Sequence, residues 1–153
     1  MNIFNYLMAK YVPELLGKTE AEKVKVQENL FVIRDLKYAI TLPCYEPDNS
    51  KLPDALANIV PKIELIEKKL GENEWLVGDS PTICDLWLME NTDQLQMMTH
   101  GAWLKEHPTL EAHNARVKSI PSIKDYLNSP RYFEGPFNTP LASTNNIPQD
   151  YWN

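Results

Sequence analysis

Residues 78–86, GDSPTICDL, carry the strongest fold signal in this chain of 153 residues. Thr82 is followed three positions later by Asp85, which is the spacing of a helix capping box. In such a box the hydroxyl accepts from an early backbone N–H, and the acid accepts from the N–H of the cap residue. Pro81 and Leu86 flank the box where a hydrophobic staple would lie. The stretch therefore predicts a firmly capped helix beginning at Thr82.

The helix after this box is expected to be central to the fold. Its first turns carry the run LWLM at residues 86–89, which is too apolar to face water on every side. A helix of this kind is buried among others, and we expect it to extend to about Met98. Thr82 and Asp85 are therefore interpreted as structural cap residues without a catalytic role.

Further segments show apolar residues at helical spacing. They predict helices over residues 2–16, from about 20 to Pro43, from about 51 to 70, over 109–119 and over 121–127. Val24 is assigned to the buried face of the second helix, and Val60 to that of the third. No segment alternates as a strand would. The expected fold is all-α.

Beyond Asn128 the composition changes to proline and glycine with aromatic residues between them. We expect an extended C-terminal tail that packs over the helices, because large aromatic side chains favour burial. The aromatic residues assigned to this packing are Tyr132, Phe133, Phe137 and Trp152.

Composition excludes some function classes. The formal net charge of -6, from 15 basic and 21 acidic residues, argues against nucleic acid or an anionic membrane as a partner. Cys44 and Cys84 lie far apart and form no paired motif, which favours a reducing compartment. The first residues lack the pattern of a secretory signal, and no window has the length of a membrane span. The expected location is the cytoplasm.

Histidines do not indicate a metal site in this sequence. His100, His107 and His113 lack metal-ligand spacing and are interpreted as solvated or locally hydrogen-bonded. No phosphate-binding loop, nucleophile elbow or carboxylate pair is present either. We expect no metal.

Several motifs together resemble one known family. They are LG at 16–17 before TEAEK at 19–23, CYEP at 44–47, WLVGD at 75–79 before the capping box, and SPRYF at 129–133 followed by PF at 136–137. This order resembles the C-terminal helical domain of mu-class glutathione S-transferases over about residues 16–142. The box and the preceding Gly-Asp belong to the whole superfamily, whereas CYEP and the tail motif narrow the resemblance to the mu class.

The resemblance implies a two-domain enzyme of which this chain holds the second part. In that family a thioredoxin-like domain binds the co-substrate glutathione and activates its thiol, and the helical domain supplies most of the pocket for the electrophile. Residues 1–18 would be the last helix and linker of the first domain, and residues 19–153 the helical domain. The catalytic tyrosine has no counterpart, and Tyr6 falls in the remnant helix. No other cofactor is implied.

The resemblance also assigns individual residues. Tyr45 matches a tyrosine that assists the reaction from the electrophile pocket, which Phe137 and Thr139 also line. Asp35 matches an acid that contacts glutathione in the neighbouring subunit of a dimer. Each has a simpler alternative. Tyr45 could only pack at a helix end, and Asp35, close to Arg34 in the sequence, could be an ordinary surface charge.

Three functions remain open at this point. The first is the electrophile-binding part of a mu-like transferase that conjugates glutathione to hydrophobic electrophiles, inactive as this chain alone because thiolate and electrophile must share one site. The second is a non-catalytic interaction module, either as a homodimer or with another protein, because an uncovered apolar face must find a partner. The third is a truncated gene product without a function of its own.

Overall fold

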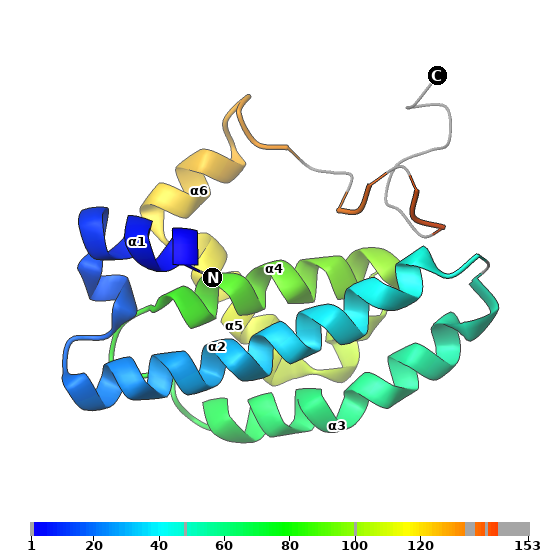
Figure 1. Ribbon diagram of the computed structural model, residues 1–153, viewed down its shortest axis with the longest axis horizontal. Coiled ribbons are helices and arrows are strands. Elements are labelled where there is room, and N and C mark those ends of the chain that lie inside the picture. Colours follow the sequence, from blue (N-terminus) through cyan, green and yellow to red (C-terminus); the bar gives the residue numbers. More distant parts are fainter. Residues whose placement is uncertain (1, 48, 100, 134–136, 140, 144–153) are drawn as a thin grey trace.

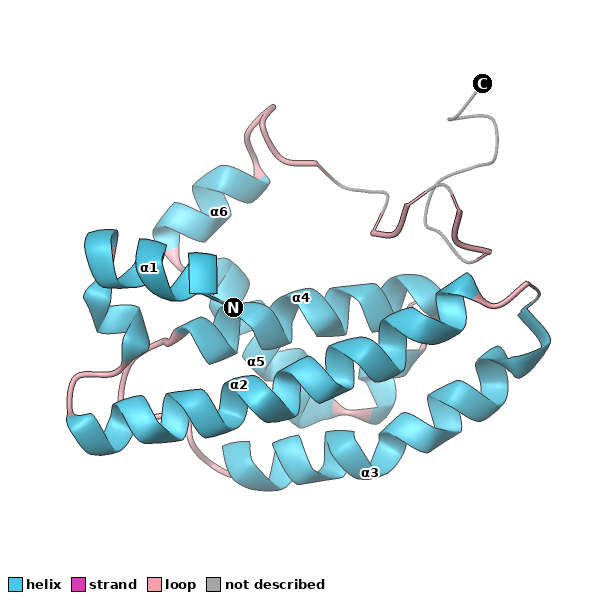
Figure 2. Ribbon diagram, in the orientation of Figure 1, coloured by secondary structure: helices cyan, strands magenta, loops and turns pink. Residues whose placement is uncertain are grey.

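The structure, a computed structural model, describes residues 2–47, 49–99, 101–133, 137–139 and 141–143. These residues form helices and contain no strand, so the all-α prediction is confirmed (Figures 1 and 2). The α-helices are α1 (Asn2–Tyr11), α2 (Glu20–Thr41), α3 (Leu52–Leu70), α4 (Ile83–Met98), α5 (Pro108–Ser119) and α6 (Pro121–Leu127). Short 3-10 helices span Pro13–Leu16, Leu42–Tyr45, Asn49–Lys51 and Trp103–Glu106.

Helix α4 lies at the centre of the bundle, as the capping box predicts. It packs against α2 on one side and α5 on the other, while α3 packs along the far side of α2 (Figure 1). Leu88 and Leu95 of α4 are fully buried, as are Ile33 of α2 and Ile63 of α3. These helices therefore share one hydrophobic core, which supplies most of the stabilisation of such a bundle.

Two capped helix starts lie next to each other at one end of the bundle. At the start of α2, the Thr19 hydroxyl accepts from the Glu22 N–H at 3.1 Å, and Glu22 accepts from the N–H of Thr19 in return. Gly78, just before the α4 box, has a φ of +71°, and a Cβ there would lie 3.3 Å from a Glu22 carboxylate oxygen. Glycine thus fits both the backbone conformation and the close approach of the two starts.

The structure corrects three details of the helix pattern. Pro13 follows α1, and the expected helix over residues 2–16 divides into α1 and a 3-10 turn because proline removes a backbone donor. Val24 is 60% exposed, and the buried face of α2 begins at Val26 instead. Val60 also lies at the surface of α3.

Helix α1 leaves much of its apolar surface in contact with solvent. Ile3, Phe4 and Tyr11 are exposed, although the sequence predicts an amphipathic helix packed on the domain. Figure 1 shows α1 lying across the N-terminal end of α4, separate from the long helices. The prediction of a closely docked α1 is therefore only partly met.

The described parts of the C-terminal tail lie on the side of α4 that faces away from α3 (Figure 1). We call residues 137–139 and 141–143 the docked tail. They form hydrogen bonds with the 3-10 turn that follows α2. Phe137 is partly buried, but Tyr132 is 37% exposed and Phe133 is 61% exposed, against the prediction that both are buried. Trp152 lies outside the described residues.

Within the described part of the chain, no helix combines the length and the apolar character that crossing a membrane requires. The same residues bring together no group of three histidine, cysteine or acidic side chains able to hold a metal ion. His107 and His113 take part in other contacts, whereas His100 lies outside the described residues.

Candidate functional site

Tyr45 and Thr139, which the sequence assigns to one pocket, are in direct contact. Tyr45 lies in the 3-10 turn that follows α2, and its side chain is 42% exposed. The Thr139 N–H donates to the Tyr45 phenol oxygen at 3.2 Å. Hydrogen bonding with the Thr139 side chain, and then with its N–H, lowers the pKa of the Tyr45 phenol, because these bonds favour the phenolate. The Tyr45 phenol thus lies at the surface of the bundle, hydrogen-bonded to Thr139 of the tail.

Other hydrogen bonds hold the docked tail against the same end of the bundle. The buried Gln94 side chain of α4 donates to the Asn138 amide oxygen at 3.2 Å, and Lys37 of α2 donates to Gln94 at 2.8 Å. The N–H and hydroxyl of Ser143 donate to the Cys44 carbonyl at 2.7 and 3.0 Å. The tail is thus fastened on both sides of Thr139, which fixes its position beside Tyr45.

Phe137 lines a different space, which we call the aromatic cleft. This cleft encloses about 440 Å³ between α4, α6 and the tail. Its lining residues are Leu86, Met89, Glu90, Asp93, Ile123, Tyr126, Leu127, Tyr132, Phe133 and Phe137. Tyr45 is not among them, so the predicted pocket residues divide between the tail contact and this cleft.

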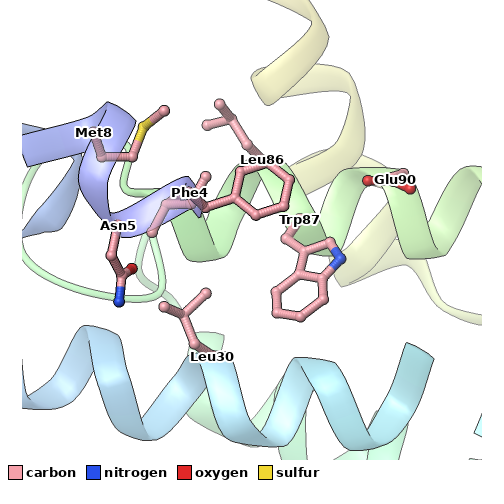
Figure 3. Close-up of a pocket in the computed structure, with 8 residues that line it drawn as sticks. Phe4, Asn5, Met8, Leu30, Leu86, Trp87 and Glu90 are labelled. Atoms are coloured by element: carbon pink, nitrogen blue, oxygen red, sulfur yellow. The ribbon is translucent and has the colours of Figure 1, made fainter. Parts of the chain in front are cut away.

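A second, more apolar cavity of about 340 Å³ separates α1 from α2 and α4. Figure 3 shows Phe4 and Met8 of α1 facing Leu86 and Trp87 of α4, with Leu30 of α2 below them. Leu86 and Glu90 line both this cavity and the aromatic cleft. The exposed face of α4 is therefore hollowed along its first turns, from α1 to the tail.

The sequence model of the family described as "Glutathione S-transferase, C-terminal domain" matches residues 34–130, more than half of the chain. The chain belongs to this family. It is 30% identical to glutathione S-transferase Mu 1 of Oryctolagus cuniculus over 88% of this chain and 61% of the relative. It is 28% identical to glutathione S-transferase Y1 of Cricetulus longicaudatus over 94% and 65%, respectively.

A solved structure agrees with the family assignment. NaGST-2 matches this glutathione S-transferase C-terminal domain with a TM-score of 0.71 and 26% identity, over 85% of this chain and 66% of that one. The chain thus spans less than two thirds of the length of the relatives named here. The resemblance that the motifs indicate is confirmed.

Asp35 lies apart from the other assigned residues of this transferase domain. It is on the exposed side of α2, and its carboxylate is 3.5 Å from the Arg34 guanidinium. No contact in the described residues connects it with Tyr45 or the docked tail. Its role as a glutathione contact across a dimer stays a prediction.

Thr82 and Asp85 form the capping box that starts α4, and the box extends further than the sequence indicates. Asp85 accepts from the Thr82 N–H at 2.8 Å and from the Thr82 hydroxyl at 2.9 Å. It also accepts from the Leu76 N–H at 2.9 Å, and His113 Nε2 lies 2.9 Å from it. The interpretation of His113 as solvated or locally bonded is wrong, because its side chain is fully buried and its partner lies in another helix.

Both cysteines of this domain are buried and free. Burial raises the pKa of the Cys84 thiol to about 12 and also raises that of Cys44. A thiol with a raised pKa holds little thiolate at neutral pH, so neither side chain is suited to act as a nucleophile.

Residues that the sequence did not assign include Gln94 and Asn138. Both are polar and almost fully buried, and each bonds to the other. The available signal was the polar run ENTDQ at residues 90–94, inside a helix that is otherwise apolar and central. Buried amides require partners, so such a run indicates contacts with other elements.

Proposed function

We propose that this chain is the electrophile-binding part of a mu-like glutathione transferase, which conjugates glutathione to hydrophobic electrophiles. The observation that carries the proposal is the contact between Tyr45 and the backbone of Thr139. It brings the exposed phenol of Tyr45 next to a tail that the Gln94–Asn138 bond fastens. Residues 1–18 would belong to a thioredoxin-like domain, and residues 19–153 to the helical domain.

In this proposal Tyr45 assists as a hydrogen-bond donor, and Phe137 and Thr139 form the wall of the electrophile pocket. Asp35 would contact glutathione in the second subunit of a homodimer. Glutathione is the co-substrate, and no other cofactor is required. We further propose the cytoplasm as the compartment, which the two free cysteines support.

The proposal predicts that the isolated 153-residue chain has no appreciable transferase activity, because it would hold only the electrophile side of the reaction. The test uses glutathione and chlorodinitrobenzene with the chain alone and with the chain fused behind a mu-class thioredoxin-like domain. Only the fusion should conjugate glutathione to chlorodinitrobenzene. Turnover by the chain alone, or none by a folded fusion that binds glutathione, would contradict the proposal.

Tyr45 can be tested within the same fusion. Tyr45→Phe removes one donor and should lower kcat/KM by about three- to tenfold, the value of one neutral hydrogen bond. Tyr38→Phe is the matched control, because Tyr38 is exposed on α2 and lies outside the tail contact. Equal losses in the two variants would exclude an assisting role for Tyr45.

The alternative function is a non-catalytic interaction module. It is favoured by apolar side chains that α2 and the following turn leave at the surface, namely Phe31, Tyr38 and Leu42. Clustered apolar residues of this kind mark association surfaces. Sedimentation at increasing concentration distinguishes this case, since a monomer at all concentrations argues against self-assembly.

A further inference from the structure

Lys37 of α2 is held between two side chains of α4. Its ammonium donates to a carboxylate oxygen of Glu90 at 3.3 Å and to the amide oxygen of Gln94 at 2.8 Å. Glu90 and Gln94 are four positions apart and share one side of α4. The Lys37 side chain is only 23% exposed. Its charge is therefore partly removed from water and depends on these two partners.

The Lys37 ammonium fixes the orientation of the buried Gln94 amide. An ammonium carries donors and no acceptor, so Gln94 must turn its oxygen toward Lys37. The Gln94 nitrogen then faces the docked tail, where it donates to the amide oxygen of Asn138 at 3.2 Å. Gln94 is fully buried and Asn138 is 6% exposed, so water competes little for this bond.

The same direction of donation continues from Asn138 to Cys44. Burial raises the pKa of the Cys44 thiol, and hydrogen bonding with the Asn138 side chain lowers it in part. A bond that lowers the pKa of a thiol brings a donor to its sulfur, so the Asn138 nitrogen is the group that faces Cys44. We call Lys37, Gln94, Asn138 and Cys44 the amide relay, because each member donates to the next.

The direction of the amide relay decides how the docked tail lies. Thr139 follows Asn138 directly, and its N–H donates to the Tyr45 phenol oxygen. Without an ammonium beside it, Gln94 would lose the contact that distinguishes its oxygen from its nitrogen. Two buried amides can pair in either direction, and each direction places the backbone of the tail differently. The charge of Lys37 leaves one of these arrangements.

We propose that Lys37 is a positioning residue for the electrophile pocket. It acts through Gln94 and Asn138, whose orientation it selects. The docked tail then holds Thr139 beside Tyr45. This role rests on the proposed function, in which the contact between Thr139 and Tyr45 belongs to that pocket. The positioning itself is a property of this chain, and it is measured without glutathione or an electrophile.

The first test follows hydrogen exchange at the Thr139 N–H by NMR in the 153-residue chain. Lys37→Met keeps a flexible side chain of similar length and removes the donor. It should speed this exchange by at least about tenfold, the value of a hydrogen bond from a charged group. Lys37→Arg keeps a charged donor and should restore most of the protection. Core amides such as that of Leu88 should keep their rates, whereas a general loss of stability would speed them too.

Lys118→Met is the matched control. Lys118 also donates to a carboxylate of α4, that of Asp93, at 2.6 Å, and its side chain is 37% exposed. It lies on α5 and is not a member of the amide relay. Lys118→Met should leave exchange at the Thr139 N–H unchanged. Equal acceleration in this control, or no acceleration in Lys37→Met, would overturn the proposal.

A double-mutant cycle tests whether Lys37 acts through Gln94. Gln94→Met is similar in size and breaks the amide relay at its second member, so it should speed exchange about as much as Lys37→Met. Combining the two substitutions should add little, because they interrupt one pathway. Effects that add in full would show that Lys37 acts by another route and would overturn the proposal. Circular dichroism shows which variants fold. If Gln94→Met does not, the comparison of Lys37→Met with Lys118→Met decides alone.

The fusion with a thioredoxin-like domain extends the test to the reaction. Lys37→Met should raise the KM for chlorodinitrobenzene by about three- to tenfold, with a smaller change in the KM for glutathione, because the electrophile pocket loses its fixed wall. An inactive fusion would contradict the transferase proposal and leave the exchange result standing. An active fusion whose KM for the electrophile does not change in Lys37→Met would contradict the positioning role alone.

Discussion

Replacing Asp85 by alanine tests how the start of α4 holds the bundle together. The carboxylate is fully buried and meets four donors: the N–H groups of Leu76 and Thr82, the Thr82 hydroxyl and His113 Nε2. These groups come from the loop before α4, from α4's own cap and from α5. One side chain therefore joins three segments of the fold.

The expected loss of stability follows from the groups left behind. A buried donor without a partner costs about 1–3 kcal/mol, and four donors lose the same acceptor. The Thr82 hydroxyl can rotate to another acceptor, and the loop carrying Leu76 can relax, so the losses will not simply add. We expect Asp85→Ala to lower the free energy of unfolding by about 3–5 kcal/mol, a large part of the stability of an ordinary domain.

Urea unfolding followed by tryptophan fluorescence measures this difference. Asp85→Asn should lose less, about 1.5–3 kcal/mol, because the amide oxygen still accepts while its nitrogen cannot. Asp79→Ala is the control, since Asp79 is highly exposed and its pair with Lys18 contributes little. If Asp85→Ala and Asp79→Ala unfold at the same urea concentration, the account of Asp85 as the joining residue is refuted.

Two further predictions concern titrating groups. Cys84, with a pKa of about 12, and Cys44, whose pKa is also raised, should resist iodoacetamide in the folded chain and react when urea unfolds it; labelling of either under native conditions would contradict their burial. Tyr45 has a lowered pKa, so Tyr45→Phe should remove an ionisation step below the ordinary range of a phenol from the ultraviolet titration. Because the folded pKa is the lower one, Tyr45 stabilises the tail contact at alkaline pH, and this contribution fades as the pH falls through that folded pKa.

Much of the fold could be predicted because its signals are local. The capping box joins residues three positions apart, and helical spacing identifies each long helix from its own segment. Val24 shows the limit of a loose pattern. At 3.6 residues per turn it lies about 120° around α2 from Leu30, and the structure exposes it.

Contacts between distant segments set the second limit on what the sequence can predict. Asp85 could be identified as a cap residue, but nothing in the local pattern indicates that His113 is its partner. The two lie 28 positions apart, and only the packing of α5 on α4 brings them together. Because His113 lacks metal-ligand spacing, nothing in the sequence indicates that it lies in the core. Its burial depends on Asp85, a partner that the residues around His113 do not indicate.

The candidate site depends even more on contacts between residues that are far apart in the sequence. Its assigned residues came from the family resemblance, and the contact that matters joins Tyr45 with Thr139 across 94 positions. Gln94 and Asn138, which fasten that contact, are 44 positions apart. Because a buried amide must be paired, the polar run in α4 required partners from outside the helix, and the tail supplies one. The polar residues of a central helix thus indicate where a distant segment docks, even though they cannot identify that segment.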